Sequence, residues 1–308
     1  IVLKKGHDLG ISGVPNPDNI VTIAPKKVAL LPSAFRSVKP KLMVQEGDDV
    51  KIGTPLFFDK IKPDVRWASP ASGKVSNIQF GDRRVIEKIE IKVIGNDYLD
   101  FDKKDMNEIC ELKNQEVLDC ILKANLFPLI RQRPFNKVAD PNDRPRDIFV
   151  SLVNSAPLSL DISLFLQKNT NAFQAGINAL SRLTSGKVYV SSRNGLEFEN
   201  SIAQTFEGPH PAGNVGIQIH HIKPIKPGDV IWTVDAQNVI TLGKLFIEGK
   251  FIPDRLIGIG GSGSSDPFVC STTMGCSISD ILKNQNFSSI VRIISGDILT
   301  GTKVSEND

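Results

Sequence analysis

Three of the four histidines lie in one short stretch, "GPHPAGNVGIQIHHI", as His210, His220 and His221. Imidazole groups bind metals and transfer protons near neutral pH. We predict that "IQIHH" is extended, so that His220 and His221 point to opposite faces and cannot hold one metal ion without distortion. His210 stands between two prolines, which favours a hydrogen-bonded ring that holds a loop in place. We therefore expect structural histidines, with a proton-transfer role or a metal site as the alternatives.

A second stretch, "GIGGSG" at residues 258–263, matches the glycine spacing of dinucleotide-binding loops. Such a loop needs a helix directly after it, because the helix N-terminus meets the pyrophosphate. Here "SSDPFV" follows, and Pro267 together with the extended residue before it breaks a helix. We therefore predict a β-hairpin turn rather than a nucleotide site.

The four cysteines, Cys110, Cys120, Cys270 and Cys276, contain no Cys-x-x-Cys pair. Zinc and iron-sulfur sites usually need that spacing. Cysteine is also among the residues most often found in protein cores. We expect four free thiols in a reducing compartment.

The composition is that of a soluble globular protein, with 308 residues, 40% apolar and 23% charged. This length allows two or three domains, since a single core seldom exceeds about 250 residues. The net charge of +3 is too small and scattered to predict nucleic-acid binding. No apolar run approaches the roughly 18 residues that span a bilayer, and no signal peptide is recognisable. We expect a cytoplasmic protein without a membrane span.

The first domain, residues 1–100, is predicted to be rich in β-strands after an N-terminal extension. Residues 28–95 alternate apolar and polar side chains between glycine turns, and the two halves look alike. This pattern resembles the barrel-sandwich hybrid of biotinyl and lipoyl domains, which carry a modified lysine on a hairpin tip. Lys60 stands near that place, but the stretch that follows is longer and contains Pro63, so we expect an altered tip and a scaffold role.

The second domain, residues 101–254, alternates predicted helices and strands. The predicted helices are "EVLDCILKAN", "TNAFQAGINALSRLTSG" and "AQNVITLGKLFIEG", and the predicted strands are "RDIFVSLV", "KVYVSS" and "VIWTVD". Strands separated by helices of this length predict a parallel, right-handed, Rossmann-like α/β sheet. The third part, residues 255–308, returns to short strands at "RLIGIGG", "SSIVRIISG" and "DILTG".

Motifs along essentially the whole chain resemble one family, the NqrA subunits of the Na(+)-translocating NADH:quinone reductase. They are "KKGHDLGISGVP", "EGDDVKIGTPLF", "SPASGKV", "RQRPFNKV", "GKVYV", "FEGPHPAGNVGIQIHHIKPI", "GKLFIEGKF" and "VRIISGDILTGT". The resemblance implies a barrel-sandwich hybrid domain, a Rossmann-like domain and the start of a β-grasp (SLBB-like) domain. Members of the family continue well beyond residue 308, so we expect the rest of that domain and a helical C-terminal part to be missing.

The family is similar to flavin-bearing and iron-sulfur subunits of other respiratory complexes, from which this chain departs. Where those relatives place glycines against the FMN phosphate, the matching stretch here has Arg131, Arg133 and Pro134. Where they place acidic residues, this chain has Asn154 and Ala156. We therefore expect this chain to bind no redox cofactor and no metal, with NADH, flavins and iron-sulfur centres on other subunits.

The resemblance implies a peripheral subunit on the cytoplasmic side of the bacterial inner membrane. It would contribute to ubiquinone binding together with the membrane protein NqrB, in a complex that exports sodium, and the isolated chain would be inactive. No residue is identified as catalytic. The candidate quinone contacts are Arg131, Arg133, Phe135, His210 and His221 as donors or stacking groups, with Phe206 and Trp232 as apolar walls.

Each candidate also has an ordinary structural interpretation. Loop arginines are usually solvated or paired at an interface, and the tryptophan of "VIWTVD" is typical of a core. Two alternatives to a quinone-binding role therefore stay open. One is a purely structural docking subunit of the same complex, whose quinone site lies wholly in NqrB. The other is a free-standing biotinyl or lipoyl-type carrier or nucleotide enzyme.

Overall fold

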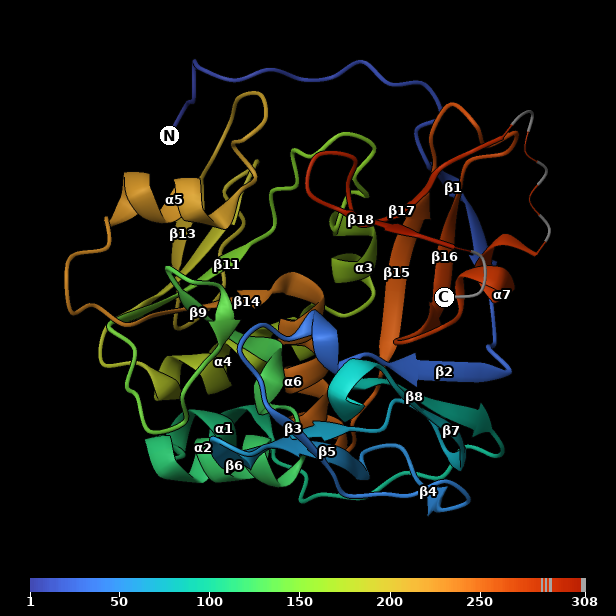
Figure 1. Ribbon diagram of the computed structural model, residues 1–308. Helices are drawn as coiled ribbons and strands as arrows, with labels where there is room; N and C mark the ends of the chain where they lie inside the picture. The colour runs from blue at the N-terminus through green and yellow to red at the C-terminus, as the bar shows by residue number, and fades with distance from the viewer. Residues whose placement is uncertain (284, 286, 288–289, 306–308) are drawn as a thin grey trace.

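The structure is a computed structural model that describes residues 1–283, 285, 287 and 290–305. The chain forms three units: a β unit, an α/β unit and a small β unit that joins the C-terminal strands with one strand from the start of the chain (Figure 1). The predicted α/β multi-domain class is confirmed.

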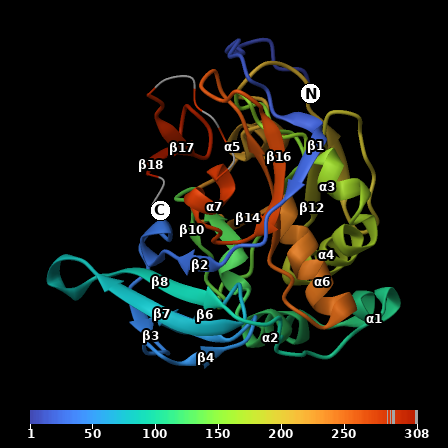
Figure 2. The same cartoon turned by 90° about the vertical axis from the view of Figure 1, so that its right-hand side faces the viewer.

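The first unit consists of two antiparallel sheets. Its strands are β2 Lys27–Leu30, β3 Pro40–Leu42, β4 Asp49–Val50, β5 Pro55–Asp59, β6 Lys62–Ala68, β7 Gly73–Phe80 and β8 Ile86–Val93. The sheet orders are β2-β8-β7-β4 and β3-β5-β6. Gly47 and Gly53 have φ angles of 92° and 99° at two of the predicted turns, where a β-carbon would be strained. The β7–β8 hairpin projects away from the rest of the molecule (Figure 2).

The expected altered tip at Lys60 is wrong. Lys60 and Ile61 form a two-residue turn between β5 and β6, and Asp59 pairs directly with Lys62. The register shifts between Phe58 and Asp59, which accommodates the additional residues around Pro63 as an irregularity in β6. The additional residues after Lys60 therefore distort strand β6, and the turn between β5 and β6 stays tight.

The second unit is a six-stranded sheet flanked by helices. Its strands are β9 Ile130–Arg133, β10 Lys137–Val138, β11 Asp147–Ser151, β12 Val188–Ser192, β13 Ile202–Thr205 and β14 Ile231–Asp235. Its helices are α1 Met106–Glu111, α2 Asn114–Lys123, α3 Ser163–Gln167, α4 Thr170–Leu183, α5 Val215–Ile222 and α6 Ala236–Glu248. All three predicted helices and all three predicted strands are confirmed, and α6 ends at Gly249 with φ 67°.

The sheet order is β10-β9-β14-β11-β12-β13. Strands β11 to β14 are parallel to one another, as predicted, but β9 runs antiparallel to both of its neighbours, β14 and β10. The prediction of a wholly parallel sheet is therefore wrong at this edge. The connection between β9 and β10 is too short for a crossover helix, and a short connection can join only antiparallel strands.

Helices cover the two faces of this sheet unequally. Side chains of α4 and α6 pack with Ile148 and Val150 on one face. On the other face α5 packs Ile219 against Phe149 and Ile231. Because α5 has only eight residues, part of this second face is left to other elements.

The histidine stretch differs from its prediction, because residues 215–222 form helix α5 and not a strand. Val215, Ile219 and Ile222 recur at helical spacing and pack on the sheet. His220 and His221 are both exposed in the last turn, with their ring centroids 5.3 Å apart. The extended prediction for "IQIHH" failed because the apolar residues of the longer stretch follow the helical period.

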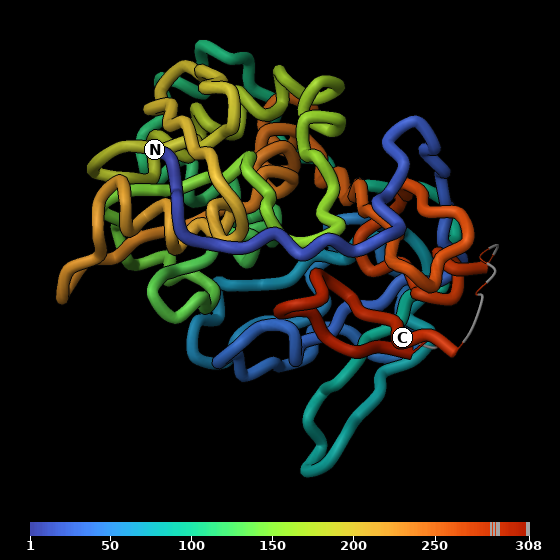
Figure 3. Tube along the Cα trace, turned by 90° about the horizontal axis from the view of Figure 1, so that it is seen from above, coloured from blue at the N-terminus to red at the C-terminus, as the bar shows by residue number. Residues whose placement is uncertain are grey.

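The third unit combines both ends of the chain. Its elements are β1 Asn16–Thr22, β15 Asp254–Ile259, β16 Phe268–Thr273, α7 Ile278–Leu282, β17 Ile293–Ser295 and β18 Thr302–Val304. Strand β1 pairs in parallel with β16, so the N-terminal extension belongs to this sheet rather than to the first unit. Seen from above, the first residues cross the molecule towards this sheet (Figure 3).

The glycine stretch forms the turn between antiparallel β15 and β16, as predicted. Strand β16 and helix α7 were not predicted. "DILTG" is the turn between β17 and β18 and not a strand, because Asp297 accepts hydrogen bonds from the backbone of Leu299 and Thr300. Residues 288 and 289 of the predicted strand "SSIVRIISG" lie outside the described residues.

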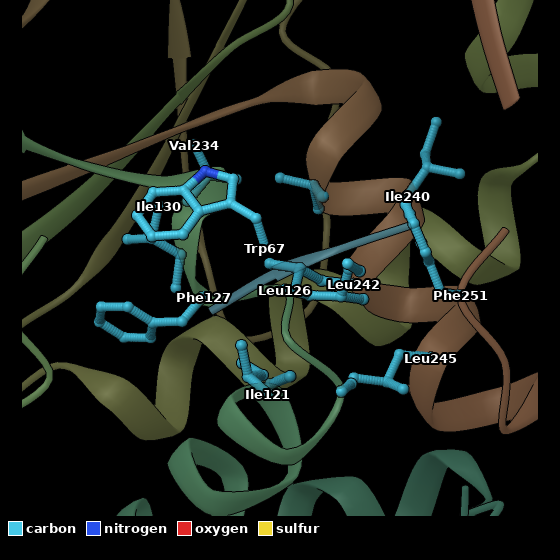
Figure 4. Packing of buried hydrophobic residues seen from close by; sticks show 14 of the residues in the cluster. Trp67, Ile121, Leu126, Phe127, Ile130, Val234, Ile240, Leu242, Leu245 and Phe251 are labelled. Atoms are coloured by element: carbon cyan, nitrogen blue, oxygen red, sulfur yellow. The ribbon is translucent and has the colours of Figure 1, made fainter. Parts of the chain in front are cut away.

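The first and second units share one hydrophobic core. Trp67 of β6 lies beside Leu126, Phe127 and Ile130 of the α/β unit (Figure 4). Asn125 also donates a buried hydrogen bond of 3.0 Å to the carbonyl of Gly53. Packing between these two units therefore resembles a domain interior.

Candidate functional site

The sheet of the α/β unit changes its direction of growth at β11. The chain continues from β11 to β12 on one side and later places β14 on the other side. In open α/β sheets, ligands bind at the carboxyl ends of the strands next to such a switch point. The expected site therefore follows Ser151 of β11 and Asp235 of β14.

A cavity of about 1090 Å³ lies at this place. Its walls include the carboxyl ends of β11 and β14, the start of α6, the β15–β16 turn and β17. The α/β unit and the C-terminal unit therefore build it together. Its size suits a ligand the size of a cofactor or drug molecule.

The cavity wall exposes polar and apolar surface in nearly equal parts. Apolar lining residues include Leu129, Leu152, Leu160 and Ile257. The ionisable side chains among the described lining residues are Arg131, Arg133, Asp235, Arg292 and Asp297. Small-molecule sites place polar groups among apolar side chains, and this wall offers both kinds.

Arg131 and Arg133 are two residues apart on β9, so both side chains point to the same face of the sheet. They pair with Thr233 and Ile231, which places them on the face that α5 covers. Burial lowers the pKa of both guanidinium groups, and the charge of Arg133 lowers the pKa of Arg131 further. The guanidinium of Arg131 lies over the Phe35 ring, 5.1 Å from its centroid.

His210 lies at the rim of this region. Its Nδ1 is 3.1 Å from the Ser155 hydroxyl, and that hydroxyl accepts a hydrogen bond from the backbone N–H of Gly213. Asp8 accepts a hydrogen bond from the backbone N–H of His210. The neighbours of Ser155, residues 154 and 156, line the cavity. His210 therefore connects the N-terminal segment to the loop that forms one cavity wall.

The structure does not bring the seven predicted quinone contacts together. Arg131 and Arg133 line the cavity. Phe206 and Trp232 are core residues, 0% and 1% exposed, and Trp232 packs edge-on against Phe127. Phe135 is 66% exposed at the β9–β10 turn and His221 is exposed on α5.

Two groups of cavity residues were not predicted as part of a site. Asp235 is the last residue of the confirmed strand β14, and its position at a strand's carboxyl end was the signal that could have identified it. The glycine turn was interpreted only as a hairpin, yet residues 258–264 line the cavity. A β-carbon on Gly13 would overlap the carbonyl of Gly261, so the N-terminal segment packs directly on this turn.

Membrane-spanning helices and metal clusters are both absent from the described part of the chain. No helix there has the length and the hydropathy needed to cross a bilayer. No group of three or more His, Cys, Asp or Glu side chains in these residues could hold a metal ion.

Comparison with known proteins covers all three units. The family models described as "NqrA N-terminal barrel-sandwich hybrid domain", "NqrA second alpha/beta domain" and "NQRA C-terminal domain" match residues 1–94, 112–251 and 256–306. The NqrA subunit of the Na(+)-translocating NADH-quinone reductase from Yersinia pestis is 37% identical over 310 residues, which cover 99% of this chain and 69% of that protein. The NqrA subunit from Neisseria meningitidis is 35% identical over 306 residues, covering 98% of this chain and 68% of that protein. This chain therefore belongs to the NqrA family of Na(+)-translocating NADH-quinone reductase subunits.

Proposed function

We propose that this chain is the peripheral NqrA subunit of a Na(+)-translocating NADH:quinone reductase and contributes to ubiquinone binding. The single observation that carries the quinone part is the cavity of about 1090 Å³ at the switch point of the sheet. A quinone ring needs an apolar slot with one or two hydrogen-bond donors near its carbonyl oxygens. The apolar wall formed by Leu129, Leu152 and Leu160 would hold the ring, and Arg131 or Arg133 would donate to a carbonyl.

In this proposal the chain supplies binding and position rather than electron transfer. NADH, flavins and iron-sulfur centres belong to other subunits, and the membrane protein NqrB is the chief partner on the cytoplasmic side of the inner membrane. Strand β9 matches the stretch in which distant relatives place their flavin-binding glycines. In this chain it carries two arginines whose side chains line the cavity. This supports a site that has been changed from nucleotide binding to another ligand.

The test is an equilibrium titration of the chain with a short-chain ubiquinone. Leu160→Trp adds bulk to the cavity wall and should weaken binding at least about tenfold, whereas Phe135→Ala at the exposed turn should leave it unchanged. Saturable binding that Leu160→Trp does not affect would rule out this cavity. Binding seen only after NqrB is added would favour the structural docking role or a site shared with that protein.

A further inference from the structure

Arg131 and Arg133 place two positive charges on one face of β9, at the wall of the cavity. Adjacent like charges repel each other, and burial makes this more costly. Most half-buried arginines in proteins compensate by pairing with a carboxylate or by filling their hydrogen-bonding positions. The partners of these two side chains therefore decide what the cavity is suited to bind.

Other half-buried arginines of this chain have such partners. Arg146 pairs with Asp147 at 2.7 Å and with Asp229. Arg255 donates to the Asn238 side chain at 2.6 Å and to the Thr241 hydroxyl at 3.1 Å. These contacts neutralise or saturate the guanidinium groups locally.

Arg131 and Arg133 differ from them. Among the described residues neither guanidinium forms an ion pair or a hydrogen bond, and the Nε of Arg133 is buried without an acceptor. The contact of Arg131 with the Phe35 ring offers a cation–π attraction but no anion. Two guanidinium groups with unused donors thus border one cavity.

The acidic side chains of the described cavity wall are engaged elsewhere. Asp235 accepts a hydrogen bond from the backbone N–H of Gln237 and attracts the charge of Arg255. Asp297 accepts hydrogen bonds from Leu299 and Thr300 within its own turn. Neither carboxylate neutralises the arginine pair.

We propose that Arg131 and Arg133 form a subsite for an oxyanion, a phosphate or carboxylate group carried by a small ligand in this cavity. Guanidinium groups present planar sets of N–H donors that match both kinds of oxyanion and bind them through charge-assisted hydrogen bonds. The pair of charges favours a dianion over a monoanion. This inference goes beyond quinone binding, because neutral quinone would leave both charges uncompensated.

The experiment is isothermal titration of the chain with inorganic phosphate, pyrophosphate and succinate at constant ionic strength. We expect saturable binding of one anion per chain that is weakened at least about tenfold in Arg133→Gln and in Arg131→Gln. Arg84→Gln, in the projecting β7–β8 hairpin, is the matched control and should bind like the wild type. The order of the three affinities distinguishes phosphate from carboxylate ligands.

Absence of saturable binding for all three anions, or equal binding by Arg133→Gln and the wild type, would overturn the proposal. Thermal unfolding in anion-free buffer gives a second readout. Arg133→Gln should keep or raise the melting temperature, because it removes an uncompensated charge, and a clear drop would contradict this. Quinone titration of Leu160→Trp is a separate measurement, so failure of the anion subsite and failure of the quinone site are distinguishable.

Discussion

Single residues of this chain accommodate buried charge in two different ways. At one end of the sheet Asp147 has a fully buried side chain that pairs with Arg146 and Lys223, both at 2.7 Å. It also accepts a hydrogen bond from the backbone N–H of Lys187. Two strands away in the same sheet, Arg133 is aligned with Asp147 through Ile231, but the pair Arg131 and Arg133 has no such partner among the described residues. The ion pairs of Asp147 hold strands and loops together. The unpaired arginines leave charge and hydrogen-bond donors available for a ligand.

We expect Asp147→Ala to lower the free energy of unfolding by about 3–5 kcal/mol, because it leaves two cationic groups without their buried partner. Urea denaturation measures this loss. Asp49→Ala removes an exposed carboxylate 3.7 Å from Lys74 and should cost less than about 1 kcal/mol. A similar small loss for both variants would contradict a structural role for the Asp147 cluster.

The thiol of Cys270 yields a prediction about pH. Burial raises its pKa from 9.0 to about 11, with the nearby Cys276 as a smaller cause. Because the folded protein holds this proton more tightly than the unfolded chain, stability should be unaffected below pH 9 and should decline as pH rises from 9 to 11. Iodoacetamide should label Cys270 slowly in the native protein at about pH 8 and rapidly in urea, as mass spectrometry would show. Equal labelling rates in the two states would contradict the buried, protonated thiol.

Among the secondary-structure elements, helices α4 and α6 pack unusually closely. A β-carbon on Gly243 would overlap the backbone carbonyl of Ala172, and one on Gly176 would overlap that of Val239. The glycines therefore let the two helix backbones approach each other over the sheet. This contact holds α6 in position, and the first residues of α6 form part of the cavity wall.

Gly243→Ala should lower the free energy of unfolding by about 1–3 kcal/mol, because the added methyl group forces the helices apart. Gly216→Ala in α5 is the matched control, since open space surrounds that position. There we expect no loss, and a gain of up to about 1 kcal/mol from the better helix propensity of alanine. Chemical denaturation of both variants checks the pair, and a Gly243→Ala protein as stable as the wild type would disprove the close contact.

Across the whole molecule, the three units depend on one another. The first two share a hydrophobic core that includes Trp67, which stacks on Phe57 with ring centroids 4.6 Å apart. The third unit takes its strand β1 from the start of the chain and is tied to the second by the N-terminal segment. The cavity forms where the second and third units meet.

Trp67→Ala should therefore destabilise more than the first unit. Trp67 is 3% exposed, and its truncation should cost about 3–5 kcal/mol. Because the core is shared, we expect the first and second units to unfold in one transition, at a lower urea concentration than in the wild type. Circular dichroism and limited proteolysis, followed along the same urea series, measure this. Unfolding of the first unit alone, with the α/β unit intact, would contradict a shared core.

Elements with local signals could be predicted from the amino-acid sequence. The apolar period predicted helices within residues 116–125, 170–186 and 236–249, where helices α2, α4 and α6 form. Pro267 likewise indicated that "GIGGSG" is a hairpin turn and not a nucleotide-binding loop. Family motifs along the chain predicted the three units in their observed order. These features depend on neighbours within a few residues, or on patterns that follow sequence order.

Features that depend on distant contacts became visible only in the folded chain. Residues 215–222 form helix α5, whose apolar side chains meet Phe149 and Ile231 of strands outside the local sequence. Strand β1 pairs with β16, about 250 residues away, and such pairing leaves no local signal. Of the seven predicted site residues, two lie at the cavity and the others lie in the core, at the rim or on the surface. Burial and the lack of a counter-charge among the described residues give Arg131 and Arg133 their significance, and both are properties of packing that residue type and spacing do not encode.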